Sequence, residues 1–183
     1  MIIVIPLGGE GVRFSNLGYN DPKPLVKVHG KEIIFYLLDC LKVKKNDKIF
    51  IIYNNKLEQI NFVERLSKYK YLNFLKLKKS THGPVETIFE LTSQIEKTYF
   101  NEKILILDGD TFYKKNILKQ INQKHHSIFY HITKIKDPIF SYIKINNNKV
   151  KKIVEKKKIS NMACTGAYFF NSINKFNKKA AKI

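Results

Sequence analysis

The feature that most constrains the fold is the alternation of apolar runs with segments of helical spacing, up to Leu107. Short continuous apolar runs are typical of buried strands in a parallel sheet, and apolar residues three and four positions apart predict helices. We expect strands at Ile2–Leu7, Lys48–Tyr53, Tyr71–Leu77 and Lys103–Leu107, and helices at Lys31–Lys42, Leu57–Tyr69 and Pro84–Lys97. This pattern predicts an α/β fold whose mostly parallel sheet is covered by helices on both faces.

The rest of the chain reads as shorter strands followed by one helix. Strands are expected near Ser127–Ile135, Tyr142–Ile145, Val150–Val154 and Ala163–Phe170, and the helix begins near Ser172. No linker or repeat interrupts the sequence, so we expect a single domain over residues 1–183. Because the last helix still continues at Ile183, we also expect a chain that is shortened at its C-terminus.

The net charge of +19 comes from lysine rather than arginine. Lysine and arginine total 34 against 15 acidic residues, yet Arg13 and Arg65 are the only arginines. Proteins that read bases or grip nucleic-acid phosphates favour arginine, whose planar guanidinium makes paired hydrogen bonds. We therefore interpret the excess mainly as solvated lysine, which still attracts small anions such as nucleotides. Nucleic-acid binding stays open as an alternative.

The sequence carries no signal for export or membrane insertion. It has no apolar stretch of about 18 residues, the length a membrane span needs. The apolar N-terminus has no basic residue ahead of it and is cut short by Gly8-Gly9, which fits a first strand rather than a signal peptide. Cys40 and Cys164 match no metal-binding or redox spacing. We expect a cytoplasmic protein with reduced thiols.

A glycine-rich segment, LGGEGVRF at residues 7–14, directly follows the first expected strand. Glycines let backbone amide groups approach a phosphate or a base, and arginine offers a charged fork for phosphate oxygens. The segment lacks the Gly-Lys-Ser/Thr ending of a P-loop, and Phe14 stands where the dinucleotide fingerprint needs its third glycine. The predicted nucleotide contacts are Leu7, Gly8, Gly9 and Gly11, with Arg13 facing the phosphates.

A second cation-bearing segment, DPKPLVKV, occupies residues 21–28. Lys23 stands between two prolines, which restrict the backbone and hold the lysine in one direction. It follows Arg13 by ten positions. This spacing predicts two cations on one loop that face a polyphosphate.

The third segment, Asp108-Gly109-Asp110, ends the fourth expected strand. Ligands of open α/β sheets bind at the carboxyl ends of the strands. Mg2+ commonly combines one or two carboxylates with substrate phosphates, so the segment predicts a Mg2+ site. The alternative is a plain turn with an aspartate that caps the next helix. Asp-x-Asp is also typical of glycosyltransferases that use nucleotide sugars, and that class of enzyme stays open.

The first two segments together resemble the signature of the sugar-phosphate nucleotidyltransferases. GGEGVRF and DPKPLVKV match that family's G-G-x-G-x-R-L and P-K-P-L, with Phe14 in place of leucine. The resemblance spans nearly the whole chain and implies a Rossmann-like (GT-A-like) three-layer αβα sandwich. It also implies an enzyme that joins a nucleoside triphosphate to a sugar phosphate, or a similar phosphate ester, and releases pyrophosphate. Such enzymes usually supply precursors of surface polysaccharides.

The same resemblance assigns roles to residues near the nucleotide. Arg13 and Lys23 become catalytic cations, and Asp110 becomes the ligand of Mg2+. Asp108 stands where the family is usually not acidic, so we rank it second as a ligand and place it beside the nucleotide. Gly83, just before the helix that starts at Pro84, is expected to lie against the base.

Two further segments resemble the family's acceptor-binding strands. Glu155-Lys156 matches a Glu-Lys pair in which the glutamate meets sugar hydroxyls and the lysine meets the sugar's phosphate. No proline follows Lys156 here, and a solvated charge run is the alternative. Thr165-Gly166 matches a strand that packs against the sugar, with Thr165 standing in for the usual asparagine.

One residue that the resemblance implies is missing. The family takes a second metal-binding aspartate from a later strand, but no acidic residue follows Glu155. The nucleotide, the acceptor and the oligomeric state stay open. The competing functions are a glycosyltransferase, which would release a nucleoside diphosphate, and a non-catalytic protein that binds nucleotides or nucleic acid.

Overall fold

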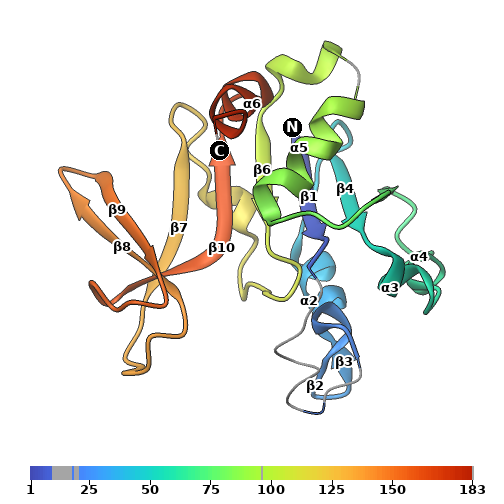
Figure 1. The fold of residues 1–183 in the computed structure, drawn as a ribbon, viewed down its shortest axis with the longest axis horizontal. Helices are drawn as coiled ribbons and strands as arrows, with labels where there is room; N and C mark the ends of the chain where they lie inside the picture. The colour runs from blue at the N-terminus through green and yellow to red at the C-terminus, as the bar shows by residue number, and fades with distance from the viewer. Residues whose placement is uncertain (10–17, 19–20, 96, 183) are drawn as a thin grey trace.

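The computed structural model describes residues 1–9, 18, 21–95 and 97–182, and its main feature is one mixed sheet (Figure 1). The parallel strands are β1 at Ile2–Leu7, β4 at Lys48–Tyr53, β5 at Leu72–Lys76 and β6 at Ile104–Leu107. The antiparallel strands are β7 at Ser127–Ile132, β8 at Ser141–Asn146, β9 at Lys149–Glu155 and β10 at Met162–Phe170. They pair in the order β5-β4-β1-β6-β10-β8-β9, and β7 also pairs with β10.

Helices cover both faces of the parallel strands. One face carries α2 at Ile33–Cys40, α3 at Asn55–Glu58 and α4 at Phe62–Arg65, and the other carries α5 at Pro84–Gln94 and α6 at Ile173–Ala180. Successive residues of a strand point to opposite faces. Ile3 of β1 accordingly packs in one buried cluster with Ile34 of α2, whereas Val4 packs in another with Ile88 of α5. This arrangement confirms the predicted three-layer α/β fold with a mostly parallel centre.

Residues 127–165 form a second region, which we call the wing; β1, β4, β5, β6 and the helices on them are the parallel half. The wing comprises β7, β8, β9 and the first residues of β10. Its β8–β9 hairpin extends to the side, away from the helices (Figure 1). The two regions meet where β10 runs antiparallel to β6.

The helix expected at Leu57–Tyr69 is wrong in extent, because the structure has two short helices there. Asn61 takes a left-handed conformation with φ of 54°, which ends one helix before the next begins. A continuous helix would place Ile60, Val63 and Leu66 on one face, but only Leu66 of these is fully buried, together with Phe62. The break therefore turns Phe62 toward the core and leaves Ile60 and Val63 partly buried.

The helix expected from Lys31 begins later, at Ile33, because Lys31–Glu32 forms a short strand, β3. This strand pairs with β2 at Lys27–Val28. The two-residue turn between them has positive φ at both His29 and Gly30, as tight hairpins require. Short 3-10 helices in the described chain lie at Lys23–Leu25, Lys97–Asn101 and Ile117–Gln120.

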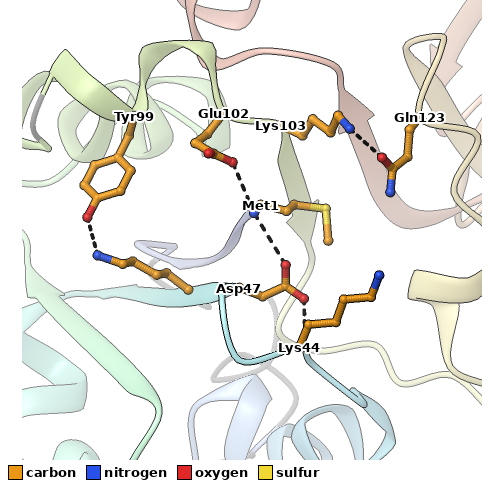
Figure 2. Close-up of polar contacts among 8 residues, drawn as sticks. Met1, Lys44, Asp47, Tyr99, Glu102, Lys103 and Gln123 are labelled. Atoms are coloured by element: carbon orange, nitrogen blue, oxygen red, sulfur yellow. Dashed lines mark hydrogen bonds and ion pairs between the residues drawn. The ribbon is translucent and has the colours of Figure 1, made fainter.

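Polar contacts hold the start of the chain against the amino ends of the parallel strands (Figure 2). The amino group of Met1 lies 3.4 Å from Asp47 Oδ1 and 3.2 Å from Glu102 Oε2. Lys103 donates a hydrogen bond to Gln123 beside them. This edge is therefore fixed, and the carboxyl edge opposite it is where ligands of such sheets bind. Among the described helices, none is long and apolar enough to cross a membrane.

Candidate active site

The carboxyl ends of β1, β4 and β6 bring three loops together. Leu7 at the end of β1 lies beside Tyr53 at the end of β4 in the parallel register. β6 runs parallel to β1 on its other side and ends at Leu107. The residues that follow these strands, Gly8-Gly9, Asn54 and Asp108, therefore start from the same edge of the sheet. This is the edge at which the sequence predicts a nucleotide site.

The turn at Gly8-Gly9 is tightly packed on the side of α5. A Cβ atom added to Gly8 would lie 2.9 Å from Thr87 Oγ1 and 2.9 Å from Leu77 Cδ1, so any larger residue would force these side chains to shift. On another side the Asn54 amide nitrogen lies 3.4 Å from the Gly8 carbonyl oxygen and 3.3 Å from that of Gly9. Leu7 and Gly8 are buried, and Gly9 is exposed. The first of the predicted contacts are thus held in a defined turn.

Two predicted residues, Gly11 and Arg13, lie outside the described residues. Their assigned roles rest on the sequence and on the resemblance alone.

Lys23 and Asp110 come together although they are far apart in sequence. Lys23 opens the 3-10 helix at Lys23–Leu25, directly after Pro22. Its Nζ atom lies 3.4 Å from Asp110 Oδ2, with the two side chains 33% and 40% exposed. A cation and a carboxylate predicted from separate segments thus share one partly open place at the end of β6. Both stay accessible to a ligand.

Asp108 has a different environment from Asp110, because it lies against Gly166 of β10, where the wing joins β6. Its backbone amide donates to the Gly166 carbonyl oxygen at 2.8 Å. A Cβ atom on Gly166 would lie 2.7 Å from Asp108 Cγ, and the φ of +70° at Gly166 also favours glycine. Burial raises the pKa of Asp108 to about 6; repulsion from Asp110 adds to the rise and Lys23 opposes it. Gly166 therefore leaves room for a carboxyl group that is costly to ionise.

Gly83 and its neighbours form the start of α5. Gly83 is the N-cap residue and Pro84 follows as the first helical residue, the position at which proline is favoured. Nothing lies within 4 Å of a Cβ atom added to Gly83, so the space beside it is open. Thr87 Oγ1 donates to the Gly83 carbonyl at 3.0 Å and lies 2.6 Å from Thr81 Oγ1. The buried Thr87 and the partly buried Thr81 therefore shape the side of α5 that faces the Gly8-Gly9 turn.

The acceptor residues predicted in the wing are more loosely held. Lys156 Nζ lies 3.4 Å from Glu155 Oε1, and both side chains are exposed. The Lys156 backbone has φ of 51°, and its amide donates to the Phe140 carbonyl at 2.9 Å. The local backbone is thus fixed while the two charged groups face solvent.

Thr165 sits at the junction of the wing with β6. Its hydroxyl donates to the Phe129 carbonyl at 3.2 Å, and its own carbonyl accepts from the Tyr113 hydroxyl at 2.9 Å. The hydroxyl proton is already used, so Thr165 could act toward a ligand only as an acceptor.

Sequence reasoning missed Asn54 as part of this site, and it left Thr87 open between a site residue and an ordinary residue of the first helical turn. Both are polar and buried, with 8% and 2% of their surface exposed. The signal for Asn54 was its place directly after a buried strand, the same place that Asp108 has after β6. The signal for Thr87 was the Gly-x-x-Glu-Thr pattern at residues 83–87, which is common in the resembling family. Its role beside Gly8 emerges only from the packing of α5 against the first turn.

Comparison with known proteins agrees with this geometry. The model of the nucleotidyl transferase family matches residues 2–181. A Methanocaldococcus jannaschii protein assigned as a UTP–glucose-1-phosphate uridylyltransferase is 25% identical over 205 aligned residues, which cover 92% of this chain and 71% of the relative.

Solved structures share the fold. The nucleoside-diphosphate-sugar pyrophosphorylase of Vibrio cholerae superposes with a TM-score of 0.78 at 22% identity, over 100% of this chain and 78% of that one. The inositol-1-phosphate CTP transferase of T. maritima gives a TM-score of 0.77 at 18% identity, over 98% and 74% of the two chains. With the family match over residues 2–181, the resemblance carried by the glycine and Pro-Lys-Pro segments is confirmed: the chain belongs to the nucleotidyl transferase family.

Proposed function

We propose that this chain transfers a nucleoside monophosphate from a nucleoside triphosphate to a small phosphate ester, in the first place a sugar phosphate, and releases pyrophosphate. We further propose that the product is a precursor of surface polysaccharides. The observation that carries the proposal is the contact of Lys23 with Asp110, 3.4 Å apart, on the sheet edge that also holds the Gly8-Gly9 turn. A lysine, a carboxylate and a glycine turn on one edge suit a triphosphate.

The reaction needs positioning and charge neutralisation more than a protein nucleophile. An oxygen of the acceptor phosphate attacks the α-phosphorus of the triphosphate. The bond from the α-phosphorus to the bridging oxygen breaks, and that oxygen leaves with the pyrophosphate. Lys23 would neutralise charge on the phosphates at the reacting centre, and Arg13 would hold the departing pyrophosphate. Lys156 would bind the acceptor phosphate from the wing.

The donor set at the end of β6 fits a Mg2+ ion. Asp108 and Asp110 repel each other enough to contribute to the raised pKa of Asp108, and a cation between them would relieve that repulsion. No third histidine, cysteine or acidic residue joins them among the described residues, so phosphate and water oxygens would complete the shell, as is usual for Mg2+. When bound, Mg2+ would neutralise charge on the phosphate oxygens. Asp110, the more exposed carboxylate, would be its main protein ligand.

The test is pyrophosphate release with Mg2+, measured for CTP, UTP, dTTP, GTP and ATP against a panel of sugar and alcohol phosphates. UTP with glucose 1-phosphate and CTP with inositol 1-phosphate enter first, because relatives carry those names. Release that depends on one pair supports the proposal and identifies both substrates. Nucleotide binding without release from any pair would count against it.

A glycosyltransferase that uses Asp108-Gly109-Asp110 is the second candidate, since Asp-x-Asp holds the metal in many such enzymes. The family match favours the nucleotidyltransferase, because glycosyltransferases lack the paired glycine and Pro-Lys-Pro segments. Release of a nucleoside diphosphate from a nucleotide sugar would reverse that preference. A basic nucleic-acid-binding protein is the third; it would bind oligonucleotides at about 50 mM salt and lose them steeply as salt rises.

A further inference from the structure

Asn54 is a buried amide side chain at the predicted nucleotide site. It directly follows β4 and is only 8% exposed. A buried amide must satisfy both its donors and its acceptor, because an unpaired polar group inside a protein is costly. Its partners therefore indicate what the residue does.

The two ends of the Asn54 side chain serve different segments. Its oxygen accepts from the Leu57 amide at 3.2 Å and caps the start of α3. Its nitrogen lies 3.3 Å from the Gly9 carbonyl oxygen and 3.4 Å from the Gly8 carbonyl oxygen. The first contact is local, but the second joins segments more than forty residues apart. Capping alone would not need the amide nitrogen.

These contacts fix the direction of the glycine turn. In a trans peptide the carbonyl and the following amide point to opposite sides. A Gly8 carbonyl held toward Asn54 therefore turns the Gly9 amide away from it, and successive amides of this kind form anion-binding turns. Thr87 and Leu77 limit the turn at Gly8 from another side, each 2.9 Å from where a Cβ atom would be. The hydrogen bonds from Asn54 therefore hold the two carbonyls of a turn that packs closely against α5.

We propose that Asn54 is a positioning residue: it holds the Gly8-Gly9 turn in the conformation that binds the nucleoside triphosphate, without touching the nucleotide itself. This inference rests on the proposed function. A glycine-rich turn has large backbone freedom and does not hold one conformation by itself. The buried amide of Asn54 supplies that restraint.

The test compares wild type with Asn54→Ser. Serine caps helices about as well as asparagine but is too short to keep the contacts with both glycine carbonyls. We expect KM for the triphosphate to rise about tenfold, with a smaller change in kcat and a moderate fall in melting temperature, because the two glycine carbonyls lose a buried donor. Asn116→Ser is the matched control, because Asn116 caps Ile117–Gln120 through Leu118 and none of its described contacts is with the turn. Asn116→Ser should leave KM for the triphosphate unchanged.

Asn54→Asp is the second variant, and it keeps the inference testable if Asn54→Ser does not fold. Aspartate also keeps the cap, but it replaces the donor with a charged oxygen next to two carbonyl oxygens. Equilibrium binding of the triphosphates, measured without acceptor, should then weaken more than in Asn54→Ser. Wild-type affinity in both folded variants would overturn this inference alone. Failure of wild type to bind any triphosphate would overturn the proposed function and this inference with it.

Discussion

The parallel half and the wing are built on the same sheet but are stabilised differently. In the parallel half, Val4, Ile51 and Leu105 are completely buried, because helices cover both faces. In the wing, Ile132 and Ile153 keep 66% and 53% of their surface exposed. The predicted site residues follow this division. Lys23 and Asp110 contact each other across distant segments, whereas the side chains of Glu155 and Lys156 pair only with each other in the contacts described.

The difference indicates a division of labour between the regions. Packing on two faces holds β1 and β6, from which the Gly8-Gly9 turn and the Asp108-Gly109-Asp110 segment start, and such positioning suits nucleotide binding and phosphoryl transfer. A wing with an open face allows its charged groups to adjust to an acceptor. We therefore expect substitutions in the parallel half to affect turnover and stability, and substitutions in the wing to affect mainly acceptor binding.

The largest expected effect contrasts one lysine from each region. Lys23→Ala should lower kcat for pyrophosphate release by about 10²–10³-fold, because it removes a positioned charge at the reacting centre. Lys156→Ala should instead raise KM for the acceptor, with kcat within a few-fold of wild type. Circular dichroism should show both folds intact. Near-normal turnover of Lys23→Ala would contradict a catalytic role for Lys23.

A second contrast concerns the stability of the two regions. Ile51→Ala in β4 removes a fully buried side chain and should lower the free energy of unfolding by about 2–5 kcal/mol. Ile153→Ala in β9 removes a side chain that is 53% exposed and should cost less than about 0.5 kcal/mol. Urea denaturation measures both values. Equal losses would mean that the wing face is covered in solution.

The pH dependence of stability should report on Asp108, at the boundary of the two regions. Between its ordinary pKa of 3.8 and the raised pKa of about 6, the folded state keeps a proton that the unfolded state has lost. Stability should therefore fall as pH rises through this window, by at most about 3 kcal/mol, and stay level above it.

Asp108→Asn should abolish this fall, whereas Asp137→Asn, at an exposed position of the wing, should keep it. Denaturation in metal-free buffer from pH 4 to pH 8 makes the comparison. A fall that persists in Asp108→Asn would assign it to another group.

The smallest expected effect tests the junction itself. Gly166→Ala should cost roughly 2 kcal/mol, because its φ of +70° disfavours a side chain and the added Cβ atom would meet Asp108. Gly83→Ala should cost under about 1 kcal/mol, since the space beside it is open. Comparing the thermal unfolding of Gly166→Ala and Gly83→Ala separates the strain at Gly166 from the general effect of replacing a glycine. Similar losses would argue against a strained junction.

The fold was largely predictable, because buried parallel strands leave a clear trace. The ranges expected for β1 and β4 agree with the structure at both ends, since each apolar run is bounded by polar or turn residues. The helix at Leu57–Tyr69 failed because spacing alone does not reveal a left-handed residue such as Asn61. The backbone conformation of Asn61 divides this segment into two short helices, although its hydrophobic pattern predicts one.

The site was predictable only where a motif named its residues. The contact between Lys23 and Asp110 follows from two segments that lead to the same sheet edge. The environment of Asp108 under Gly166 was not predictable, since it depends on how β10 pairs with β6. Asn54 belongs to none of the segments singled out in the sequence, and its contacts emerge only from packing. The roles of the predicted site residues stay predictions until substrates are tested.

The pairing of β9 has a practical consequence for handling the protein. Among the described strands β9 pairs only with β8, so its outer edge offers unpaired backbone groups to other molecules. Lys149, Lys151 and Lys152 line this strand, and like charges discourage two such edges from joining. Salt screens that repulsion. Concentrated stocks should therefore keep longer at low ionic strength, and crystallisation screens rich in salt should favour fibrous or amorphous precipitates.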